Sequence, residues 1–166
     1  MNEFVNFQKR GIELPPGCKD LIDVLPPPRE ARVPVEGLSH IERYLSRLLQ
    51  LPPKLRSVWI DSYPPVTPVT LGLIHTTKRK LCAVIFIAAE PEKSSIRSVL
   101  VAAGIPATQD EALTEGGGLY AHVITCLLPV DAAIAARLVS ELLQKGYGLS
   151  ADVELEFRYR VKANQP

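Results

Sequence analysis

The sequence predicts an α+β fold in which helices cover one face of a single sheet. Three patterns lead to this prediction: two uncharged apolar runs typical of buried strands, a helical pattern after each run, and a last segment that alternates apolar and charged residues, as a strand with one solvent-facing side does. The run at residues 81–89, LCAVIFIAA, is rich in β-branched and aromatic residues, which favours a strand over a buried helix. We expect this strand at the centre of the sheet.

Prolines divide the chain into two regions that differ in composition. Of the 15 prolines, eleven lie in the first 68 residues. Because proline fixes φ and removes a backbone donor, this part of the chain has room only for short elements joined by extended segments. We therefore expect residues 1–37 to form a proline-rich N-terminal arm and residues 38–166 to form a single domain.

The arm contains one short aliphatic segment, which prolines bracket on both sides. Leu21, Ile22, Val24 and Leu25 lie within about one helical turn and predict a short amphipathic helix. We favour the interpretation that this segment packs on the protein's own core, and the alternative is that it docks onto another protein from a proline-rich tether. Disordered chain is the third interpretation. The residues that we expect to bind a partner under the alternative are Cys18, Lys19, Asp20, Leu21, Ile22 and Leu25.

A capping pattern and an amphipathic pattern together predict a helix at residues 39–50. Ser39 and Glu42 have the S-x-x-E spacing, in which two side chains satisfy otherwise unpaired backbone donors. Apolar residues recur at helical spacing on one side of this segment, and two successive prolines end it. One face of this helix is therefore expected to be buried.

Two strands are predicted between this helix and the central strand, at residues 55–61 and 69–76. The polar interval 77–80 has a length typical of hairpin connections, so residues 69–76 should pair with the central strand. The cations of this interval are expected to keep a sheet edge soluble rather than to bind phosphate.

The C-terminal half predicts helices and strands in a regular order. Pro91 suits a first helical turn and Gly104 a helix end, while good helix formers and an apolar stripe mark the second helix. For residues 106–115, the alternative to a polar edge strand is a small helical turn. The expected elements are a helix over residues 91–103, a polar edge strand over 106–115, an apolar strand over 119–128, a helix over 132–145 and an alternating strand over 151–162.

From residue 81 onward, this order of elements is the split βαβ pattern of ferredoxin-like folds. Right-handed crossovers place the first and third strands of that pattern in the middle, and these are the two apolar runs. The hairpin strand 69–76 competes with the last strand for one edge of the central strand, so the alternative is another mixed α/β sheet with an added N-terminal hairpin strand. Because two helices cover only one face, the helix at 39–50, the arm or a second subunit should cover the other.

Charge and targeting signals restrict the partners and the location. A formal net charge of +1 gives no overall field that would attract nucleic acid or anionic lipid. No stretch approaches the ~18 apolar residues of a membrane span, and the first residues lack a basic region followed by an apolar one. Three cysteines leave an odd thiol over if two were bridged. We expect a cytoplasmic protein with free thiols and no membrane partner.

The sequence does not predict a metal or cofactor site. His122 and Cys126 share one face of a predicted strand but lie about 13 Å apart at ~3.3 Å per residue, which is too far for one ion. The glycines at 116–118 precede a strand, whereas a phosphate-binding loop leads from a strand into a helix. A hairpin loop is therefore favoured for them.

Catalytic and RNA-binding signatures are weak as well. A cysteine beside His75 or His122 could form a thiolate pair, but no family signature accompanies such a pair. Phe86 and Tyr120 are the only aromatic residues on the two apolar strands, too few for an RNA-binding sheet. No residue is therefore assigned a catalytic role, and nucleic acid is a disfavoured partner.

These observations favour a non-enzymatic protein-interaction or assembly module, whose ligand is a protein partner or a second copy of the chain in a homodimer. The alternative is a regulatory domain that senses a small molecule at a subunit interface or beside the glycine loop. An enzyme of unknown class ranks third. The fold alone selects none of these, because unrelated functions share the ferredoxin-like topology.

Overall fold

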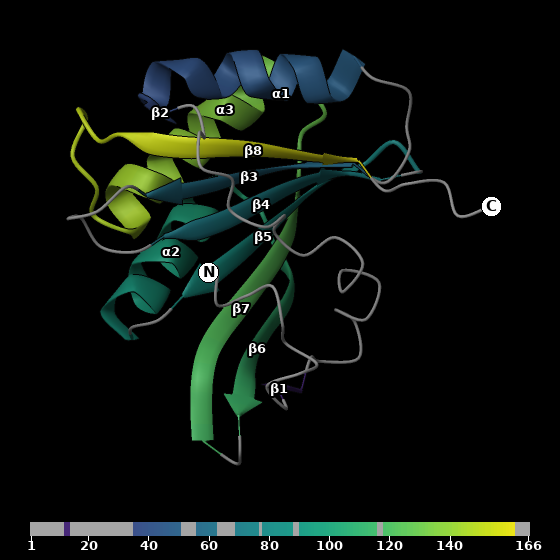
Figure 1. Ribbon diagram of the computed structural model, residues 1–166. Helices are drawn as coiled ribbons and strands as arrows, with labels where there is room; N and C mark the ends of the chain where they lie inside the picture. Colours follow the sequence, from purple (N-terminus) through teal and green to yellow (C-terminus); the bar gives the residue numbers. More distant parts are fainter. Residues whose placement is uncertain are drawn as a thin grey trace.

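One antiparallel sheet and three α-helices make up the described part of the chain (Figure 1). The computed structural model describes residues 12–13, 35–50, 56–62, 69–76, 78–87, 90–115 and 118–161. The predicted α+β class is confirmed. The predicted partner-binding residues, from 18 to 25, lie outside the described residues.

Within the described residues, the sheet contains six longer strands and two strands of two residues each. The short strands, both from the predicted arm, are β1 (Ile12–Glu13) and β2 (Val35–Glu36). The longer strands are β3 (Arg56–Ser62), β4 (Thr70–His75), β5 (Leu81–Ile87), β6 (Ala107–Glu115), β7 (Gly118–Leu128) and β8 (Leu155–Val161). The helices are α1 (Ile41–Gln50), α2 (Glu90–Ala102) and α3 (Ala132–Glu141).

The central position of β5 is confirmed. This strand lies between β7 and β4, and all of its residues except Cys82 are buried, as the uncharged run predicts. The predicted hairpin with β4 is confirmed too, since Thr70 pairs with Phe86 and the register continues to the turn. There the Thr76 N–H donates a hydrogen bond to the Lys80 carbonyl oxygen over 2.9 Å.

The strand order is β1-β6-β7-β5-β4-β3-β8-β2, and all neighbouring strands are antiparallel. A ferredoxin-like sheet would pair β8 with β5, whereas β3 and β4 lie between them here. The ferredoxin-like arrangement is therefore not confirmed. The reason is local: short connections make β3, β4 and β5 pair in succession, and β8 joins the edge that β3 leaves open.

Helix α1 begins differently from the prediction. A 3₁₀ turn, Leu38–His40, precedes it. The N-cap residue of this turn is Gly37, which has no side chain to cap it. The predicted capping box of Ser39 and Glu42 is wrong, because Ser39 lies inside the first turn rather than before it.

Helix α3 begins at a side-chain cap and ends in a wider turn. Oδ1 of Asp131 accepts a hydrogen bond from the Ile134 N–H over 2.9 Å. At its other end the helix continues into a π-helical turn, Leu142–Gly146. A Cβ atom on Gly146 would lie 2.7 Å from Cγ1 of Ile96, so the absence of a side chain lets α2 approach this turn closely.

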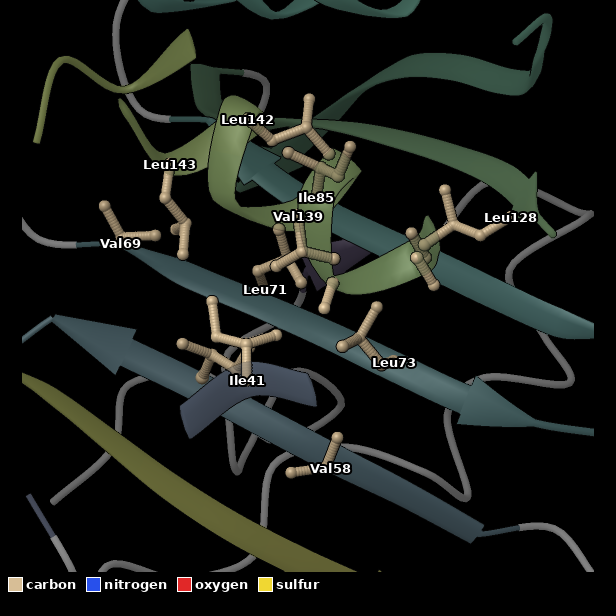
Figure 2. Packing of buried hydrophobic residues seen from close by; sticks show 14 of the residues in the cluster. Ile41, Val58, Val69, Leu71, Leu73, Ile85, Leu128, Val139, Leu142 and Leu143 are labelled. Atoms are coloured by element: carbon tan, nitrogen blue, oxygen red, sulfur yellow. The ribbon is translucent and has the colours of Figure 1, made fainter. Parts of the chain in front are cut away.

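All three helices pack on the same face of the sheet. α1 lies beside α3, and α2 lies against the π-helical turn (Figure 1). Figure 2 shows Ile41 of α1 and Val139 of α3 among strand residues such as Val58 and Leu73 in one buried hydrophobic core. The helix at 39–50, one of the three covers expected for the opposite face, therefore does not cover that face.

The position of α1 follows from the width of the sheet. β3 and β8 extend the sheet beyond β4, and this extension needs a cover of its own. Tyr44 of α1 stacks on Phe157 of β8, with ring centroids 4.1 Å apart and an interplanar angle of 4°. The Tyr159 hydroxyl donates a hydrogen bond to the Tyr44 carbonyl oxygen over 3.0 Å. α1 thus completes the layer that α2 and α3 begin.

Candidate functional site

The sheet face opposite the helices is the main candidate site, and we call it the second face. Successive strand residues alternate between the two faces of a sheet. Cross-strand pairing places Trp59, Gly72 and Val84 side by side on three neighbouring strands of the second face. The central side chains of this face, all outside the hydrophobic core beneath the helices, are Trp59, Ile74, Val84, Phe86, Val123 and Thr125.

The indole of Trp59 lies flat across β4, in the space that Gly72 leaves open. A Cβ atom on Gly72 would lie 2.6 Å from Cη2 of the indole, so a larger residue would displace the ring. The indole N–H donates a hydrogen bond to Oγ of Ser57 over 3.0 Å. The Phe86 ring lies 6.2 Å from the indole, centroid to centroid, at an interplanar angle of 35°. The two aromatic rings therefore form an apolar floor with its polar atom satisfied.

A group of polar side chains borders this floor on the β8 side. Arg158 donates from Nη2 to Oδ2 of Asp61, and the Thr70 hydroxyl donates to Oδ1 of the same carboxylate over 2.9 Å. Arg158 and Glu156 are buried. The alternating pattern of β8 predicts that these two side chains face solvent, and that prediction is wrong. Buried ionic groups need partners, which Asp61 supplies to Arg158.

A second polar border lies on the β6 side of the floor. A β-bulge between Ala107 and Gln109 shifts the register of β6 against β7. The Thr108 hydroxyl lies 2.8 Å from the Thr125 hydroxyl, which donates to Oε1 of Gln109 over 3.3 Å. The second face thus has an apolar, aromatic centre between two hydrogen-bonded polar borders.

A separate charged cluster joins α2 to β6 and β7. Nε and Nη2 of Arg97 donate to the two oxygens of Asp110, each over 2.7 Å, and His122 Nε2 contacts Oδ1 of the same carboxylate. The Arg97 guanidinium and then His122 lower the pKa of Asp110 from its ordinary value of 3.8 to about 2. Since both carboxylate oxygens already accept charge-assisted hydrogen bonds, this cluster is suited to holding α2 on the sheet rather than to proton transfer.

The two described cysteines are poorly suited to nucleophilic catalysis. Burial raises the pKa of the Cys126 thiol to about 12 and raises that of Cys82 as well. A catalytic cysteine needs the opposite shift, because the thiolate is the nucleophile. Cys82 pairs with Ile74, so its side chain and that of His75 point to opposite faces of the sheet.

No metal site is found among the described residues, where no group of three His, Cys, Asp or Glu side chains converges. His75 is buried, and its Nδ1 has no hydrogen-bond partner. Gly118, the last of the glycines at 116–118, is the first residue of β7, and Glu115 pairs with it across the hairpin. This pairing agrees with the predicted hairpin loop.

The sequence prediction missed most of the second face. Its proposed partner-binding residues, Cys18, Lys19, Asp20, Leu21, Ile22 and Leu25, lie outside the described residues. A signal for the aromatic floor was present in Gly72, because glycine within an apolar strand marks a close approach of another group. No comparable signal pointed to the Asp61–Arg158 pair, since charged residues on alternating strands usually face water.

Comparisons of the chain with protein-family models, with curated proteins and with solved structures found no match. None of the described helices is long and apolar enough to cross a membrane.

Proposed function

We propose that this chain is a non-enzymatic protein-interaction or assembly module whose ligand is a polypeptide segment that lies on the second face. The observation that carries the proposal is the aromatic floor of Trp59 and Phe86 between polar borders. Protein interfaces have this arrangement, with an apolar centre rich in aromatic residues inside a polar rim. A cytoplasmic location is part of the same proposal.

The chemistry of the described polar groups supports a binding role over catalysis. The thiols of Cys82 and Cys126 have raised pKa values, and both oxygens of Asp110 are occupied by Arg97 and His122. Activated nucleophiles and general bases need free lone pairs and a pKa near the working pH. The described residues therefore offer binding groups more readily than reacting ones.

Affinity capture with the full-length chain tests this proposal when it is paired with variants of the second face. Phe86→Ala removes part of the aromatic floor, and Val101→Ala is the control, because Val101 is 79% exposed on α2, a helix of the opposite layer. We expect a partner that wild type and the control capture and that Phe86→Ala loses. A partner bound equally by all three proteins would contradict the proposal. Light scattering at rising concentration shows whether that partner is a second copy.

A thermal-shift screen against metabolites separates this function from small-molecule sensing. A ligand at 100 times its dissociation constant stabilises a folded protein by roughly 2.7 kcal/mol. We expect no such stabilisation. A metabolite that raises the melting temperature of wild type but not of Phe86→Ala would replace a polypeptide by a small molecule as the ligand of the second face.

A further inference from the structure

The hairpin between β4 and β5 presents three consecutive cations, Lys78, Arg79 and Lys80, which we call the basic tip. All three residues are exposed. β4 and β5 lie in the middle of the strand order, with β3 and β7 beside them. The basic tip is therefore not part of an edge strand, and the predicted role of its cations in protecting a sheet edge is wrong.

Hydrogen bonds hold the basic tip in a fixed shape. The Arg79 N–H donates to the Thr76 carbonyl oxygen over 2.9 Å, and the Lys80 N–H donates to Oγ1 of Thr76 over 3.1 Å. Arg79 has a φ of 58°, in the left-handed region that glycine adopts without a steric penalty. An arginine here keeps a cation at the tip although it strains the backbone, and such strained positions cluster at functional sites.

The cations of the basic tip lack the acidic partners that other cations of this protein have. In the part of the chain that the structure describes, the ion pairs of arginine and lysine are Glu36–Arg43, Glu90–Lys93, Asp110–Arg97 and Asp61–Arg158. None of these described pairs includes a member of the basic tip. An exposed group of like charges without acidic neighbours attracts a partner of opposite charge.

An exposed apolar group lies beside the basic tip. Leu128 of β7 pairs with Leu81, the residue that follows the tip, so the chain that leaves β7 continues next to Lys80. At the end of β7, in the connection and in the first turn of α3 lie Leu127, 42% exposed, Val130, 55%, and Ile134, 45%. Apolar side chains that gather at one exposed place mark a contact surface, whereas isolated ones are common on any protein.

We propose that the basic tip and the apolar group of Leu127, Val130 and Ile134 together bind an acidic polypeptide segment that carries aliphatic side chains. Carboxylates of the segment pair with the cations, and its aliphatic side chains cover the apolar group, as in interfaces with an apolar centre and a polar rim. Phe86 lies near the other end of β5. This inference therefore concerns a second surface and does not rest on the proposed function.

Other anionic ligands fit these residues less well. Three cations neutralise at most about three phosphates, which gives only weak binding to nucleic acid. Bases stack on exposed aromatic side chains, but Trp59, Phe86 and Tyr147 are buried. Tryptophan and tyrosine mark the surfaces that proteins place in membrane interfaces, whereas the apolar group is aliphatic. An acidic polypeptide uses both the charges and the aliphatic side chains.

Fluorescence anisotropy with the full-length chain and a labelled peptide of Glu, Asp and Leu tests the proposal. A control peptide carries Gln and Asn in place of the acids. Lys78→Glu is the test variant and Lys145→Glu its control, because both reverse one exposed lysine and Lys145 lies in the π-helical turn beyond the far end of α3. We expect the acidic peptide to bind more weakly as salt rises, and Lys78→Glu alone to lose affinity several-fold.

Two further variants examine the strained residue and the apolar group. Arg79→Gly removes a cation and relieves the positive φ, so we expect weaker peptide binding with an unchanged or higher melting temperature. Val130→Ser should weaken binding as well, whereas Val101→Ser, at an exposed position of α2, should not. Phe86→Ala should leave the affinity for the peptide unchanged.

Three results would overturn the proposal. The first is no binding of the acidic peptide to wild type. The second is an equal loss of affinity in Lys78→Glu and Lys145→Glu, which would reflect net charge alone. The third is binding through the basic tip to single-stranded DNA, or to vesicles of phosphatidylserine and phosphatidylcholine, without binding of the peptide. Failure of the proposed function gives a different pattern, in which Phe86→Ala loses no captured partner while the basic tip still binds the peptide.

Discussion

Gly72 leaves the space in which the indole of Trp59 lies, and this one missing side chain shapes the second face. The flat position of the ring puts it within reach of Phe86 and lets the indole N–H bond to Ser57. At the residue scale, therefore, the apolar floor depends on a glycine that has no contact of its own to offer a ligand.

Replacing this glycine should disturb both stability and the position of the indole. Gly72→Ala places a Cβ atom 2.6 Å from the Trp59 ring, and we expect the free energy of unfolding to fall by about 1–3 kcal/mol as the ring is pushed aside. Urea unfolding and tryptophan emission measure the two effects. Gly37→Ala is the matched control, because no heavy atom lies within 4 Å of its added Cβ. Equal stability of the two variants would refute the close contact.

The Asp110 carboxylate gives the protein a defined response to acid. Its pKa is lowered from 3.8 to about 2 in the folded state, chiefly by Arg97. A carboxyl with a lowered folded pKa contributes stability above pH 3.8, and that contribution is lost as the pH falls towards 2. After allowance for solvent screening, the contribution is about 1–2 kcal/mol.

Asp110→Asn should remove this contribution. We expect wild type to be more stable than the variant at neutral pH by about 1–2 kcal/mol, with the difference shrinking below pH 4. Chemical denaturation between pH 2 and 7 measures it. Arg97→Gln should shrink the same difference, since the guanidinium is the largest cause of the shift. A constant difference across the whole pH range would contradict this assignment.

At the scale of elements, the local patterns predicted which segments form helices and strands, and long-range pairing was harder to foresee. The apolar run of β5, the polar strand β6 and the hairpin between β4 and β5 follow from composition and short connections. The neighbour of β8 does not, because its alternating pattern fits any strand with one apolar side. The sequence did indicate that the hairpin strand and β8 competed for one edge of β5.

The candidate site was less predictable than the fold for a physical reason. Burial of Glu156 and Arg158 depends on tertiary neighbours such as Asp61, and a strand pattern carries information only on which side chains share a face. The same limit explains why the sequence did not predict which face of the sheet the helix at residues 39–50 covers. An amphipathic pattern predicts that one side of a helix is buried, but it does not predict which layer that side packs against.

The contact between α2 and the π-helical turn should be sensitive to one methyl group. Gly146→Ala places a Cβ atom 2.7 Å from Cγ1 of Ile96, and we expect a loss of about 1–3 kcal/mol in unfolding free energy. In a double-mutant cycle, Ile96→Ala creates room, so the two changes together should cost less than their sum. Additive losses, measured by urea unfolding, would show that the two residues do not press on each other.

At the scale of the whole molecule, the predicted arm acts as part of the fold if its aliphatic segment packs on the protein's own core. Leu21→Asp should then lower the free energy of unfolding by roughly 2–4 kcal/mol, because the change removes apolar burial and leaves a charge without a partner. Val101→Asp, on an exposed position of α2, should change it by less than about 0.5 kcal/mol. Unchanged stability together with loss of a captured partner would assign these residues to binding in trans instead.

The homodimer expected from the sequence was inferred from an apolar sheet face that the helices of the opposite layer do not cover, and it stays a prediction. We expect light scattering to give the mass of two chains as the concentration rises, and the mass of a single chain over the whole range would contradict this prediction. A dimer that persists in Phe86→Ala would use a surface other than the second face. A dimer lost in that variant would favour a second copy as the polypeptide ligand.

The two-residue strands β1 and β2 affect how readily copies of this protein aggregate through the edges of the sheet. β1 pairs with β6 at one edge of the sheet, and β2 pairs with β8 at the other. Each short strand therefore occupies part of the backbone donors and acceptors of the longer strand beside it. Such rows are templates on which other chains add strands and aggregate. Segment 14–34 connects β1 to β2. A single proteolytic cut within this segment would therefore weaken the attachment of both short strands to the sheet. We expect clipped protein to form β-rich aggregates that thioflavin detects, while intact protein remains dispersed.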